Sequence, residues 1–555
     1  MSRKIVIVGG VAGGASAAAK ARRIDERAEI TVFERGPYVS FANCGLPYFI
    51  SGKIAERDDL LLQTPERLWE RFRIRVLVRH EVLSVDRATR RVEVRNLDDG
   101  TTFWEPYDKL VLSTGAGAIV PALPGLPARN VFSVKTVPDA DAVKDWIRSH
   151  RARRAVVVGA GFIGLETAEA LHDLGLDVSV VELLPQVLPP LDSDVASFVA
   201  EHLRARGIHL WLEDGIASIS GSGEATGVVL RSGRELAADV VILSIGVRPE
   251  LKLAREAGLA IGAAGGVVVD ERMRTSDPDI YAAGDAVEIP QLVTGRPARI
   301  ALAGPANKEG RVAGANAAGG DLRFPGALGT AIVECLGLVA GKTGLSEREA
   351  AKEGLQTVVS WTHPNDHAGY YPGAEPIHLK LVAEAGTGRL LGAQAVGGRG
   401  VDKRLDVLAT ALQARMKVTD LEDLDLAYAP QFSSAKDPVV LAGSALSNAL
   451  RGEAPVVSWS QLEAELKAGE TPQLLDVRTA AERAEVALPG SLHIPLDELR
   501  DRLGELDPAR DVVCYCRVGH RGYVATRILR QRGFERTRNL TGGVTSCPAS
   551  ALARG

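Results

Sequence analysis

Apolar residues along this chain occur in short runs that end at glycine-rich turns. A valine- and isoleucine-rich run, a glycine loop, an alanine- or leucine-rich stretch and a second apolar run follow one another twice. These segments are residues 4–8, 9–14, 15–23 and 29–33 in the first set and 155–158, 159–164, 165–174 and 178–181 in the second. Strand, tight loop, helix and parallel strand in this order form a βαβ unit. The pattern therefore predicts an α/β protein with two dinucleotide-binding domains of the Rossmann type.

The remainder of the chain divides by changes in this pattern. Residues 81–112 favour β-rich connections between the two units, and residues 324–444 mix helical and strand patterns. Residues 447–457 are small and polar and include Pro and Gly, which is typical of a linker. The remaining residues, 458–555, have the length of a small independent α/β domain.

The second glycine loop has the complete G-x-G-x-x-G spacing, with Gly159, Gly161 and Gly164 between a strand and a helix. Glycines here allow a tight turn and the close approach of a pyrophosphate to the helix N-terminus. Glu182 lies 18 residues after Gly164, where a carboxylate accepts from a ribose 2′-hydroxyl and repels a 2′-phosphate. The loop therefore predicts a nicotinamide nucleotide site that prefers NADH to NADPH.

The first glycine loop departs from that spacing. Gly9, Gly13 and Gly14 are present, but Val11 occupies the position of the second glycine. Glu34, 20 residues after Gly14, supplies the acidic residue that this kind of site requires. The loop predicts a second dinucleotide site, which by itself does not identify the nucleotide.

Two further segments identify that nucleotide by resemblance. Residues 275–285 (TSDPDIYAAGD) resemble the second flavin motif of flavoproteins with two dinucleotide-binding domains. The resemblance implies that Gly284 and Asp285 contact FAD, with Asp285 on its ribityl chain. Ser-Thr-Gly at 113–115 resembles the Ala-Thr-Gly link between the FAD and NAD domains, which assigns Thr114 and Gly115 to the FAD site.

Cys44 lies in the sequence SFANCGLPY, close to the first nucleotide loop. Glutathione-reductase-like enzymes have a second cysteine five positions further on, but here that position is Phe49. A single thiol beside a flavin forms a sulfenate, a mixed disulfide or a persulfide. Cys44 alone is therefore the predicted redox partner of the flavin.

The Cys44 motif resembles that of coenzyme A-disulfide reductases and of the related NADH oxidases and peroxidases. Tyr370, in HAGYYPG, and Tyr428, in DLAYAP, favour the reductases. In that family such tyrosines come from the partner subunit of a homodimer and can donate a proton to a departing thiolate. The alternative is that both tyrosines are apolar filling of a subunit interface.

The same resemblance implies a coenzyme A site beside Cys44. Its predicted ligands are two basic residues on the first helix, which would hold phosphates, and three residues beside the thiol. They are Lys20, Arg23, Ser40, Phe41 and Asn43. Because Lys20 and Arg23 are three residues apart, they share a helix face. A solvated basic face with no ligand is the alternative interpretation of that spacing.

A second reactive thiol is predicted in the sequence CYCRVGHRG near the C-terminus. Cys516 and Arg521 stand at the two ends of a loop in which Gly519 and Gly522 permit a tight curl. Such a curl points backbone N–H groups at the sulfur, and it favours a thiolate together with the arginines. Four residues separate the cysteine from the arginine, whereas phosphatases of the same fold have five. The loop resembles that of rhodaneses, which carry sulfane sulfur as a cysteine persulfide.

Composition excludes several other classes of function. The net charge of −4 is spread without a basic block, so neither nucleic acid nor an anionic membrane is expected as a partner. Five cysteines at irregular spacing do not form a disulfide framework and are typical of a reducing, cytoplasmic environment. No metal site is expected.

These features together resemble a coenzyme A-disulfide reductase fused to a rhodanese, also described as an NADH-dependent persulfide or polysulfide reductase. The expected cofactors are FAD, NADH and coenzyme A, and the substrates are small sulfur compounds. The predicted parts are an FAD-binding domain at 1–115 and 271–323, an NAD-binding domain at 116–270, an α+β dimerisation domain at 324–446, a linker at 447–457 and a rhodanese-like α/β domain at 458–555. Three alternatives remain: an oxidase or peroxidase, a disulfide reductase with an unconnected rhodanese domain, and a non-enzymatic redox sensor.

Overall fold

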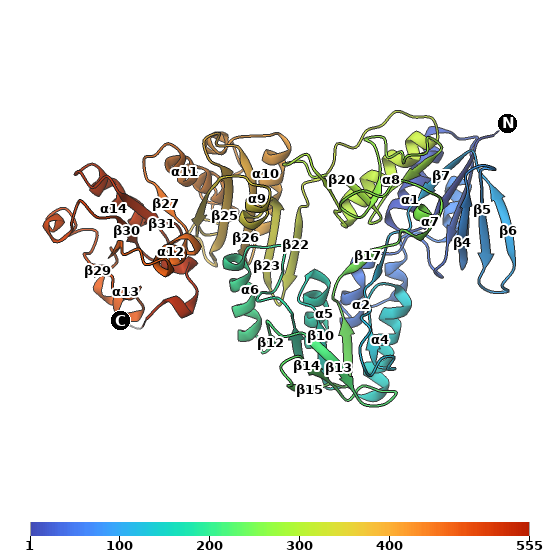
Figure 1. Ribbon diagram of the computed structural model, residues 1–555, viewed down its shortest axis with the longest axis horizontal. Helices are drawn as coiled ribbons and strands as arrows, with labels where there is room; N and C mark the ends of the chain where they lie inside the picture. The colour runs from blue at the N-terminus through green and yellow to red at the C-terminus, as the bar shows by residue number, and fades with distance from the viewer. Residues whose placement is uncertain (1, 554–555) are drawn as a thin grey trace. The chain divides into compact units, whose positions relative to one another are not determined.

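The computed structural model describes residues 2–553 and is an α/β protein made of two compact units (Figure 1). One unit runs to Pro185 and continues from Arg204 to Gly329. The other unit comprises Gln186–Leu203 and the chain from Thr330 onward. No helix among the described residues has the length and apolar character needed to cross a lipid bilayer.

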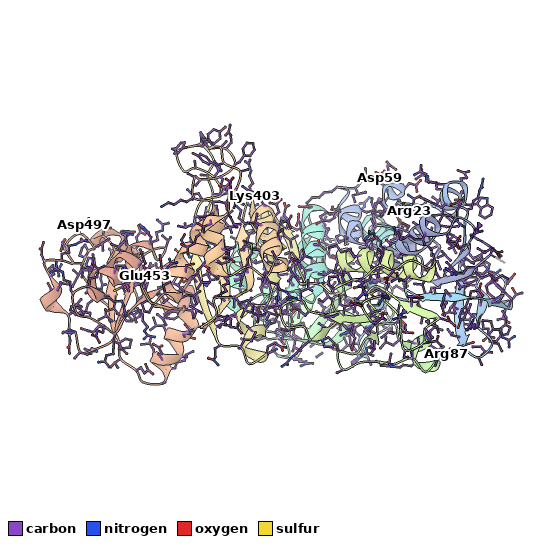
Figure 2. All side chains as sticks on the ribbon, turned by 90° about the horizontal axis from the view of Figure 1, so that it is seen from above. Arg23, Asp59, Arg87, Lys403, Glu453 and Asp497 are labelled. Atoms are coloured by element: carbon purple, nitrogen blue, oxygen red, sulfur yellow. The ribbon has the colours of Figure 1, made fainter. Side chains whose placement is uncertain are left out.

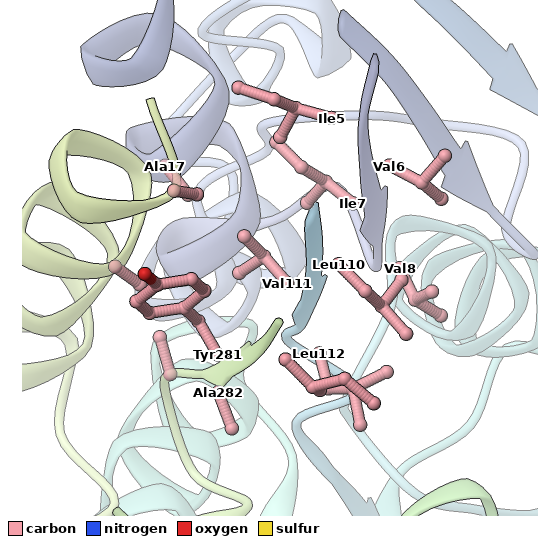
Figure 3. Packing of buried hydrophobic residues seen from close by; sticks show 14 of the residues in the cluster. Ile5, Val6, Ile7, Val8, Ala17, Leu110, Val111, Leu112, Tyr281 and Ala282 are labelled. Carbon is pink, nitrogen blue, oxygen red and sulfur yellow. The ribbon is translucent and has the colours of Figure 1, made fainter. Parts of the chain in front are cut away.

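The first unit contains a five-stranded parallel sheet in the order β19-β7-β1-β2-β3. Its strands are β1 (Lys4–Val8), β2 (Glu29–Glu34), β3 (Ile74–Val78), β7 (Lys109–Leu112) and β19 (Ile280–Ala282). Strand β1 is central and its apolar side chains are buried on both faces, as expected for a parallel strand between helical layers (Figure 3). Val8 pairs with Phe33 and with Leu112, so the strands end together next to the first glycine loop.

Helix α1 (Ala12–Ile24) follows that loop and packs against α8 (Ala303–Ala317). The two helices approach closely at glycines of α8. A Cβ at Gly310 would lie 2.1 Å from the carbonyl oxygen of Gly13, and one at Gly314 would lie 2.1 Å from that of Ala17. Distant parts of the chain therefore form one layer, which is consistent with an FAD domain assembled from two segments.

A second five-stranded parallel sheet in this unit has the order β12-β11-β10-β16-β9. Its strands are β9 (Val131–Phe132), β10 (Arg154–Val158), β11 (Asp177–Val181), β12 (His209–Trp211) and β16 (Val240–Leu243). Helix α5 (Phe162–Asp173) joins β10 to β11, as the repeated pattern predicts. Helices α1 and α5 both begin inside their glycine loops, three residues earlier than the sequence pattern indicates.

Antiparallel pairing builds the predicted β-rich connections. The strands β4 (His80–Asp86), β5 (Arg91–Asn96) and β6 (Thr102–Pro106) form a meander. The next strand, β7, instead joins the parallel sheet.

The second unit begins with an antiparallel five-stranded sheet in the order β22-β23-β26-β25-β24. Its strands are β22 (Ala331–Cys335), β23 (Leu338–Gly344), β24 (Thr357–Thr362), β25 (Ile377–Glu384) and β26 (Leu390–Gly397). Helices α10 (Val401–Gln413) and α11 (Pro438–Leu450) pack against this sheet. The result is an α+β arrangement, which agrees with the predicted fold class.

A separate parallel sheet follows in the same unit, in the order β27-β31-β30-β28-β29. Its strands are β27 (Val456–Val457), β28 (Gln473–Asp476), β29 (Leu492–His493), β30 (Val512–Tyr515) and β31 (Thr537–Leu540). Helix α11 continues through Leu450 and β27 starts at Val456. The segment between the two domains that lies outside helix and strand is therefore residues 451–455, much shorter than the 11 residues of the predicted linker.

Candidate active site

The two glycine loops have the same internal hydrogen bonds. The carboxylate of Glu34 accepts from the backbone N–H groups of Gly10 and Gly36, each at 2.7 Å. The carboxylate of Glu182 accepts from Ala160 at 2.8 Å and from Leu184 at 3.0 Å. In both sites the acidic residue at the end of the second strand therefore fixes the turn after the first strand.

The helices after these loops leave their N-termini open to an anion. Neither α1 nor α5 has a side-chain cap or an acidic residue in its first turn. A Cβ at Gly14 would lie 1.8 Å from the oxygen of Gly9, and one at Gly164 would lie 1.9 Å from that of Gly159. At Gly161 a Cβ would meet no protein atom within 4 Å. Uncapped N–H groups beside open space suit the pyrophosphates of FAD and of a nicotinamide nucleotide.

The second flavin motif is close to the first loop. Gly13 lies against Ser113 and Ala283, next to the predicted FAD residues Thr114 and Gly284. The Thr114 hydroxyl donates to the carbonyl of Glu250 at 2.7 Å. Gly115 and Gly284 have φ values of +67° and +86°, which glycine adopts without strain.

Asp285 carries a half-buried carboxylate that lies 3.8 Å from the Lys135 ammonium. Beside it, the buried Glu309 of α8 accepts from the Gly284 N–H at 2.7 Å. Burial, together with the charge of Asp285, raises the pKa of Glu309 to about 7. The predicted FAD residues therefore share their site with a carboxyl group that is only partly ionised near neutral pH.

Cys44 lies in a short 3-10 turn, Asn43–Gly45, at the start of α2 (Leu46–Ser51). The residue has an exposed face, but loss of water around the sulfur raises the pKa of the thiol. Glu166 on α5 raises that pKa further, and Lys135 opposes it. Charges from the NAD-binding domain thus act on the thiol of the FAD-binding domain.

Glu166 is connected to the cysteine motif by Tyr48, whose hydroxyl donates to the Glu166 carboxylate at 3.2 Å. Burial raises the pKa of Glu166, and the Tyr48 hydrogen bond partly offsets this effect. One turn further along α5, Glu169 and Asp173 pair with Lys53 at 2.6 and 2.9 Å. The helix that follows the NAD loop therefore holds the segment that contains Cys44.

The predicted coenzyme A ligands come from two places in the first unit. Lys20 and Arg23 lie on α1, and the exposed Arg23 is labelled in Figure 2. The Arg23 guanidinium lies 5.6 Å from the centre of the Phe72 ring. Ser40 has a φ of +49°, and Asn43 donates to the Lys135 carbonyl at 3.3 Å.

Phe41 is the fifth predicted coenzyme A ligand. It pairs with Leu61 in an isolated antiparallel bridge, which fixes the chain just before Cys44. All five residues therefore stay predicted coenzyme A ligands. Lys20 and Arg23 are candidates because of their positions on α1. Ser40, Phe41 and Asn43 are candidates because they are close to Cys44 in the sequence.

Tyr370 and Tyr428 lie next to each other in the second unit. Their hydroxyl groups are 3.0 Å apart, and the side chains are 76% and 50% exposed. The hydrogen bond between them raises the pKa of Tyr370. Two exposed phenols that contact each other do not fill an apolar core within this chain, which leaves them available to a partner.

The C-terminal domain holds Cys516 at the carboxyl end of β30. Its sulfur is buried and accepts from the Gly519 N–H at 3.2 Å, and Gly519 has a φ of +90°. Helix α14 (His520–Arg530) starts at the next residue, and Gly522 packs against Asn539. The guanidinium of Arg521 pairs with Glu482 at the rim of the loop.

Residues 541–544 form a second loop, which connects the Cys516 loop to the preceding α+β domain. Val544 donates to the Cys516 carbonyl at 2.9 Å. Three residues earlier, the Thr541 hydroxyl accepts from the backbone N–H of Trp361, on β24, at 2.7 Å. Within the second unit, the Cys516 loop therefore rests on the α+β domain through residues 541–544.

Comparison with known families accounts for nearly all of these parts. Residues 3–309 match the pyridine nucleotide-disulphide oxidoreductase family model. The chain belongs to that family. Residues 333–439 match its dimerisation domain, and residues 458–547 match the rhodanese-like domain. The predicted fold and the expected use of FAD and a nicotinamide nucleotide are thereby confirmed.

Two curated relatives share the reductase part. The NAD(P)H coenzyme A polysulfide/persulfide reductase of Pyrococcus horikoshii is 37% identical over 442 residues, which are 80% of this chain and 98% of that protein. The coenzyme A disulfide reductase of Staphylococcus haemolyticus is 36% identical over 442 residues, with the same coverage. The resemblance seen in the sequence motifs is therefore confirmed for the family.

Two solved structures extend the likeness to the C-terminal domain. Reduced CoADR-RHD from Bacillus anthracis has a TM-score of 0.96 and 43% identity, and the match covers 100% of this chain and 99% of that one. A NAD-dependent persulfide reductase from A. fulgidus has a TM-score of 0.91 and 38% identity, covering 98% and 100%. The order of reductase and rhodanese-like domains is thus shared with solved proteins.

Sequence motifs alone did not reveal four charged residues of these sites. They are Lys135, Glu166, Glu309 and Glu482, each of which reaches its site from another element. Glu166 lies two residues after Gly164, the last glycine of the NAD loop. This position is the only feature of the sequence that indicates that Glu166 lies near a nucleotide. The other three are ordinary charged residues in the sequence.

Proposed function

We propose that this chain uses NADH and FAD to reduce sulfane sulfur in persulfides or polysulfides, including coenzyme A persulfide, at Cys44. The observation that carries the proposal is the pairing of two thiol sites in one chain. Cys44 is a single exposed thiol beside the flavin motifs, and Cys516 is a buried thiol that accepts a backbone N–H. Backbone N–H groups can stabilise a sulfur anion at Cys516, and a thiol beside a flavin can be reduced after it forms a persulfide or a mixed disulfide.

In the proposed reaction, the Cys44 thiolate attacks the outer sulfur of R–S–S–H. A Cys44–S–SH bond forms, and the donor leaves as the thiolate R–S⁻. Gly9, Gly13 and residues 275–285 would hold FAD, which would supply two electrons from NADH. Reduction of the S–S bond of Cys44–S–SH would return the Cys44 thiolate and release HS⁻. Coenzyme A disulfide reacts in the same way, with coenzyme A thiolate as the leaving group.

Four features of the chain support individual steps. The open N-termini of α1 and α5 bind the two pyrophosphates. Glu182 holds the ribose of NADH and disfavours the 2′-phosphate of NADPH. Lys135 favours the Cys44 thiolate. Tyr370 and Tyr428, donated across a homodimer, protonate the departing thiolate.

Coenzyme A is placed by Lys20, Arg23, Ser40, Phe41 and Asn43. The two basic residues attract its phosphates, and the other three border the thiol. No disulfide joins the cysteines of the described residues, which suits a reducing cytoplasm.

A second candidate is an NADH oxidase that cycles Cys44 through a sulfenate. The single thiol at Cys44 permits it, and a Methanocaldococcus jannaschii relative, 34% identical over 440 residues, is named NADH oxidase. If the chain is an oxidase, NADH oxidation with oxygen or peroxide must be as fast as NADH oxidation with a persulfide.

The test compares NADH oxidation with coenzyme A persulfide, polysulfide, coenzyme A disulfide, oxygen and hydrogen peroxide. The persulfide is expected to give the highest kcat/KM, with one HS⁻ released per NADH. The Cys44→Ser variant is expected to retain FAD and lose this activity. Near-normal persulfide turnover in Cys44→Ser would refute the proposal, and faster turnover with oxygen or peroxide would favour the oxidase.

A further inference from the structure

Arg521, the arginine at the end of the sulfur-carrier loop, is not a free cation. Its Nη1 donates to Oε2 of Glu482 at 2.7 Å, and its Nη2 donates to Oε1 of the same carboxylate. Two parallel hydrogen bonds of this kind fix both the position and the plane of a guanidinium. Glu482 lies 39 residues from Arg521 in the sequence and comes from helix α13 (Ala480–Glu485).

Glu482 is itself held in place by the start of its helix. The backbone N–H and the hydroxyl of Thr479 donate to Glu482 Oε2 at 3.1 and 3.0 Å, which completes a capping box. The hydrogen bonds from Arg521 lower the pKa of Glu482 to about 2. The carboxylate is therefore ionised at every pH at which the enzyme works, and its charge offsets that of Arg521 permanently.

The other charged groups near Cys516 leave positive charge uncompensated. Arg478, on the neighbouring strand end, is buried and paired with Asp476 at 2.7 Å, and Arg483 lies 3.5 Å from the same carboxylate. Arg517 follows Cys516 directly and is exposed. The rim of the loop thus presents the exposed positive charge of Arg517 beside a neutralised Arg521–Glu482 pair.

Sulfur donors differ in the charge they bring to such a rim. An organic persulfide gives Cys516–S⁻ + R–S–S⁻ → Cys516–S–S⁻ + R–S⁻, with a total charge of −2 at the reacting atoms. Thiosulfate gives Cys516–S⁻ + S–SO₃²⁻ → Cys516–S–S⁻ + SO₃²⁻, with a total of −3. In each case one S–S bond forms and one breaks, and its electron pair leaves with the thiolate or the sulfite.

We propose that Glu482 is a positioning and specificity residue that holds Arg521 at the rim of the Cys516 loop and makes the loop favour singly charged persulfides over dianionic donors such as thiosulfate. The inference rests on the proposed role of Cys516 as a sulfur carrier. A carboxylate near the entering donor costs more for a dianion than for a monoanion, because the repulsion scales with the donor's charge. Specificity here comes from repulsion of the unwanted donor.

The chain offers a well-matched pair of variants. Glu482→Gln removes the charge, but an amide at this position still completes the capping box and still accepts from Arg521. Glu485→Gln removes the same charge from the same helix at an exposed position three residues away. If sulfur loading differs between Glu482→Gln and Glu485→Gln, the cause is therefore the contact of Glu482 with Arg521 and not the net charge of the domain.

The measurement is the second-order rate constant for sulfur loading of Cys516, followed by mass spectrometry in full-length, FAD-loaded protein without NADH. Cys44→Ser is the common background, so that Cys44 retains no sulfur. The two donors are thiosulfate and the persulfide of 2-mercaptoethanol. In Glu482→Gln the thiosulfate constant is expected to rise about 10-fold relative to the persulfide constant, which corresponds to about 1.4 kcal/mol. Added salt should reduce that gain, because it screens the exposed Arg517 and the half-buried Arg521.

Four results would overturn the inference. An equal fall with both donors in Glu482→Gln would mean that Glu482 only supports the fold. An equal change in the donor ratio in Glu485→Gln would assign the effect to the general charge of the helix. If Glu482→Gln still loads sulfur and the ratio of the two rate constants is unchanged, the specificity role of Glu482 is refuted but the carrier role of Cys516 is not. Absence of loading from either donor when Glu482 is intact would refute the carrier role of Cys516 as well.

Discussion

Tyr48, four residues after Cys44, donates its hydroxyl to the carboxylate of Glu166, at 3.2 Å, on the helix that follows the second glycine loop. The cysteine motif and the NAD motif are thereby coupled by one hydrogen bond within the first unit. The charge of Glu166 also acts on the thiol, because it raises the pKa of Cys44. Reactivity at the thiol therefore depends on a residue of the nucleotide-binding domain.

Replacement of Glu166 by Gln is expected to lower the pKa of the Cys44 thiol. The reason is that the substitution removes a negative charge that disfavours the thiolate, while Lys135 continues to favour it. The measurement is the pH dependence of Cys44 alkylation, followed on its own peptide by mass spectrometry. Glu70→Gln, at an exposed site on α3 (Pro65–Phe72), is the control. A Cys44 titration that does not move in Glu166→Gln would show that the carboxylate does not act on the thiol.

Alanine substitutions at two glycines of the NAD loop are expected to have different effects. At Gly161 a Cβ enters open space, so Gly161→Ala should fold and keep FAD. The methyl group then occupies the approach of the pyrophosphate, and the KM for NADH should rise about 10-fold or more. At Gly164 the Cβ meets the Gly159 oxygen at 1.9 Å, so Gly164→Ala should destabilise the protein by about 1–3 kcal/mol. Steady-state kinetics and urea unfolding measure the two effects; a Gly161→Ala variant with unchanged KM would show that no phosphate passes there.

The sequence can predict those parts of the site whose residues lie close together along the chain. The glycine spacing of the loops, the Cys44 segment and the Cys516 loop depend on local backbone geometry, so the sequence predicts their residues directly. Glu309 and Glu482 could not be found in this way. They reach Gly284 and Arg521 across 25 and 39 residues of sequence, through tertiary packing. The expected linker is also shorter than predicted, because α11 continues through Leu450 and buries Ser447.

Mixed dimers should test whether Tyr428 serves the flavin site of the partner subunit. Cys44→Ser and Tyr428→Phe homodimers are each expected to lose about 100-fold or more of the persulfide reductase activity. In a heterodimer of the two, one shared site carries both defects and the other carries none. A randomly exchanged mixture should therefore recover about a quarter of the normal activity, since half of the dimers have one intact site. No recovery after proven subunit exchange would mean that each site is built within one subunit.

Stability of the second unit should fall in acid because of two half-buried histidines. His363 and His378 contact each other through their Nδ1 atoms at 2.8 Å, and burial lowers their pKa values to about 3 and about 4. Between pH 6.5, the ordinary histidine value, and about pH 4, the unfolded chain binds protons that the folded chain does not. The stabilisation is therefore complete above pH 6.5 and is lost as the pH falls, by up to about 1.4 kcal/mol per pH unit for each histidine.

Replacement of both histidines by Gln is expected to make the stability of the second unit less dependent on pH. The measurement is urea unfolding at pH 5 and pH 7.5, and the difference between the two midpoints should shrink. His493→Gln, at a half-buried histidine outside this pair, is the control. A double variant with the same pH dependence as the unmodified protein would assign the acid sensitivity to other groups.

Replacement of Cys516 by Ser should separate sulfur transfer from sulfur reduction. The Cys516 sulfur is buried under a loop that rests on β24 through Thr541, and it accepts the Gly519 N–H. That environment stabilises a stored persulfide anion, but no flavin motif is encoded near Cys516 in the sequence. Cys516→Ser should therefore abolish transfer from polymeric or thiosulfate-like donors to a thiol acceptor, and mass spectrometry should no longer find one added sulfur on this peptide.

Reduction of small preformed persulfides should remain largely intact in Cys516→Ser, because such molecules diffuse to Cys44 without a carrier. Reduction of bulky polysulfide should decrease, because those donors depend on the carrier loop. Cys547→Ser is the matched control, since it removes a half-buried thiol of the same domain that donates only to the Gly543 carbonyl, at 3.6 Å. If Cys516→Ser eliminates small-persulfide reduction as completely as Cys44→Ser does, the two thiols form one obligatory relay. Transfer between them would then be a step of every turnover, and the separation of storage at Cys516 from reduction at Cys44 would be wrong.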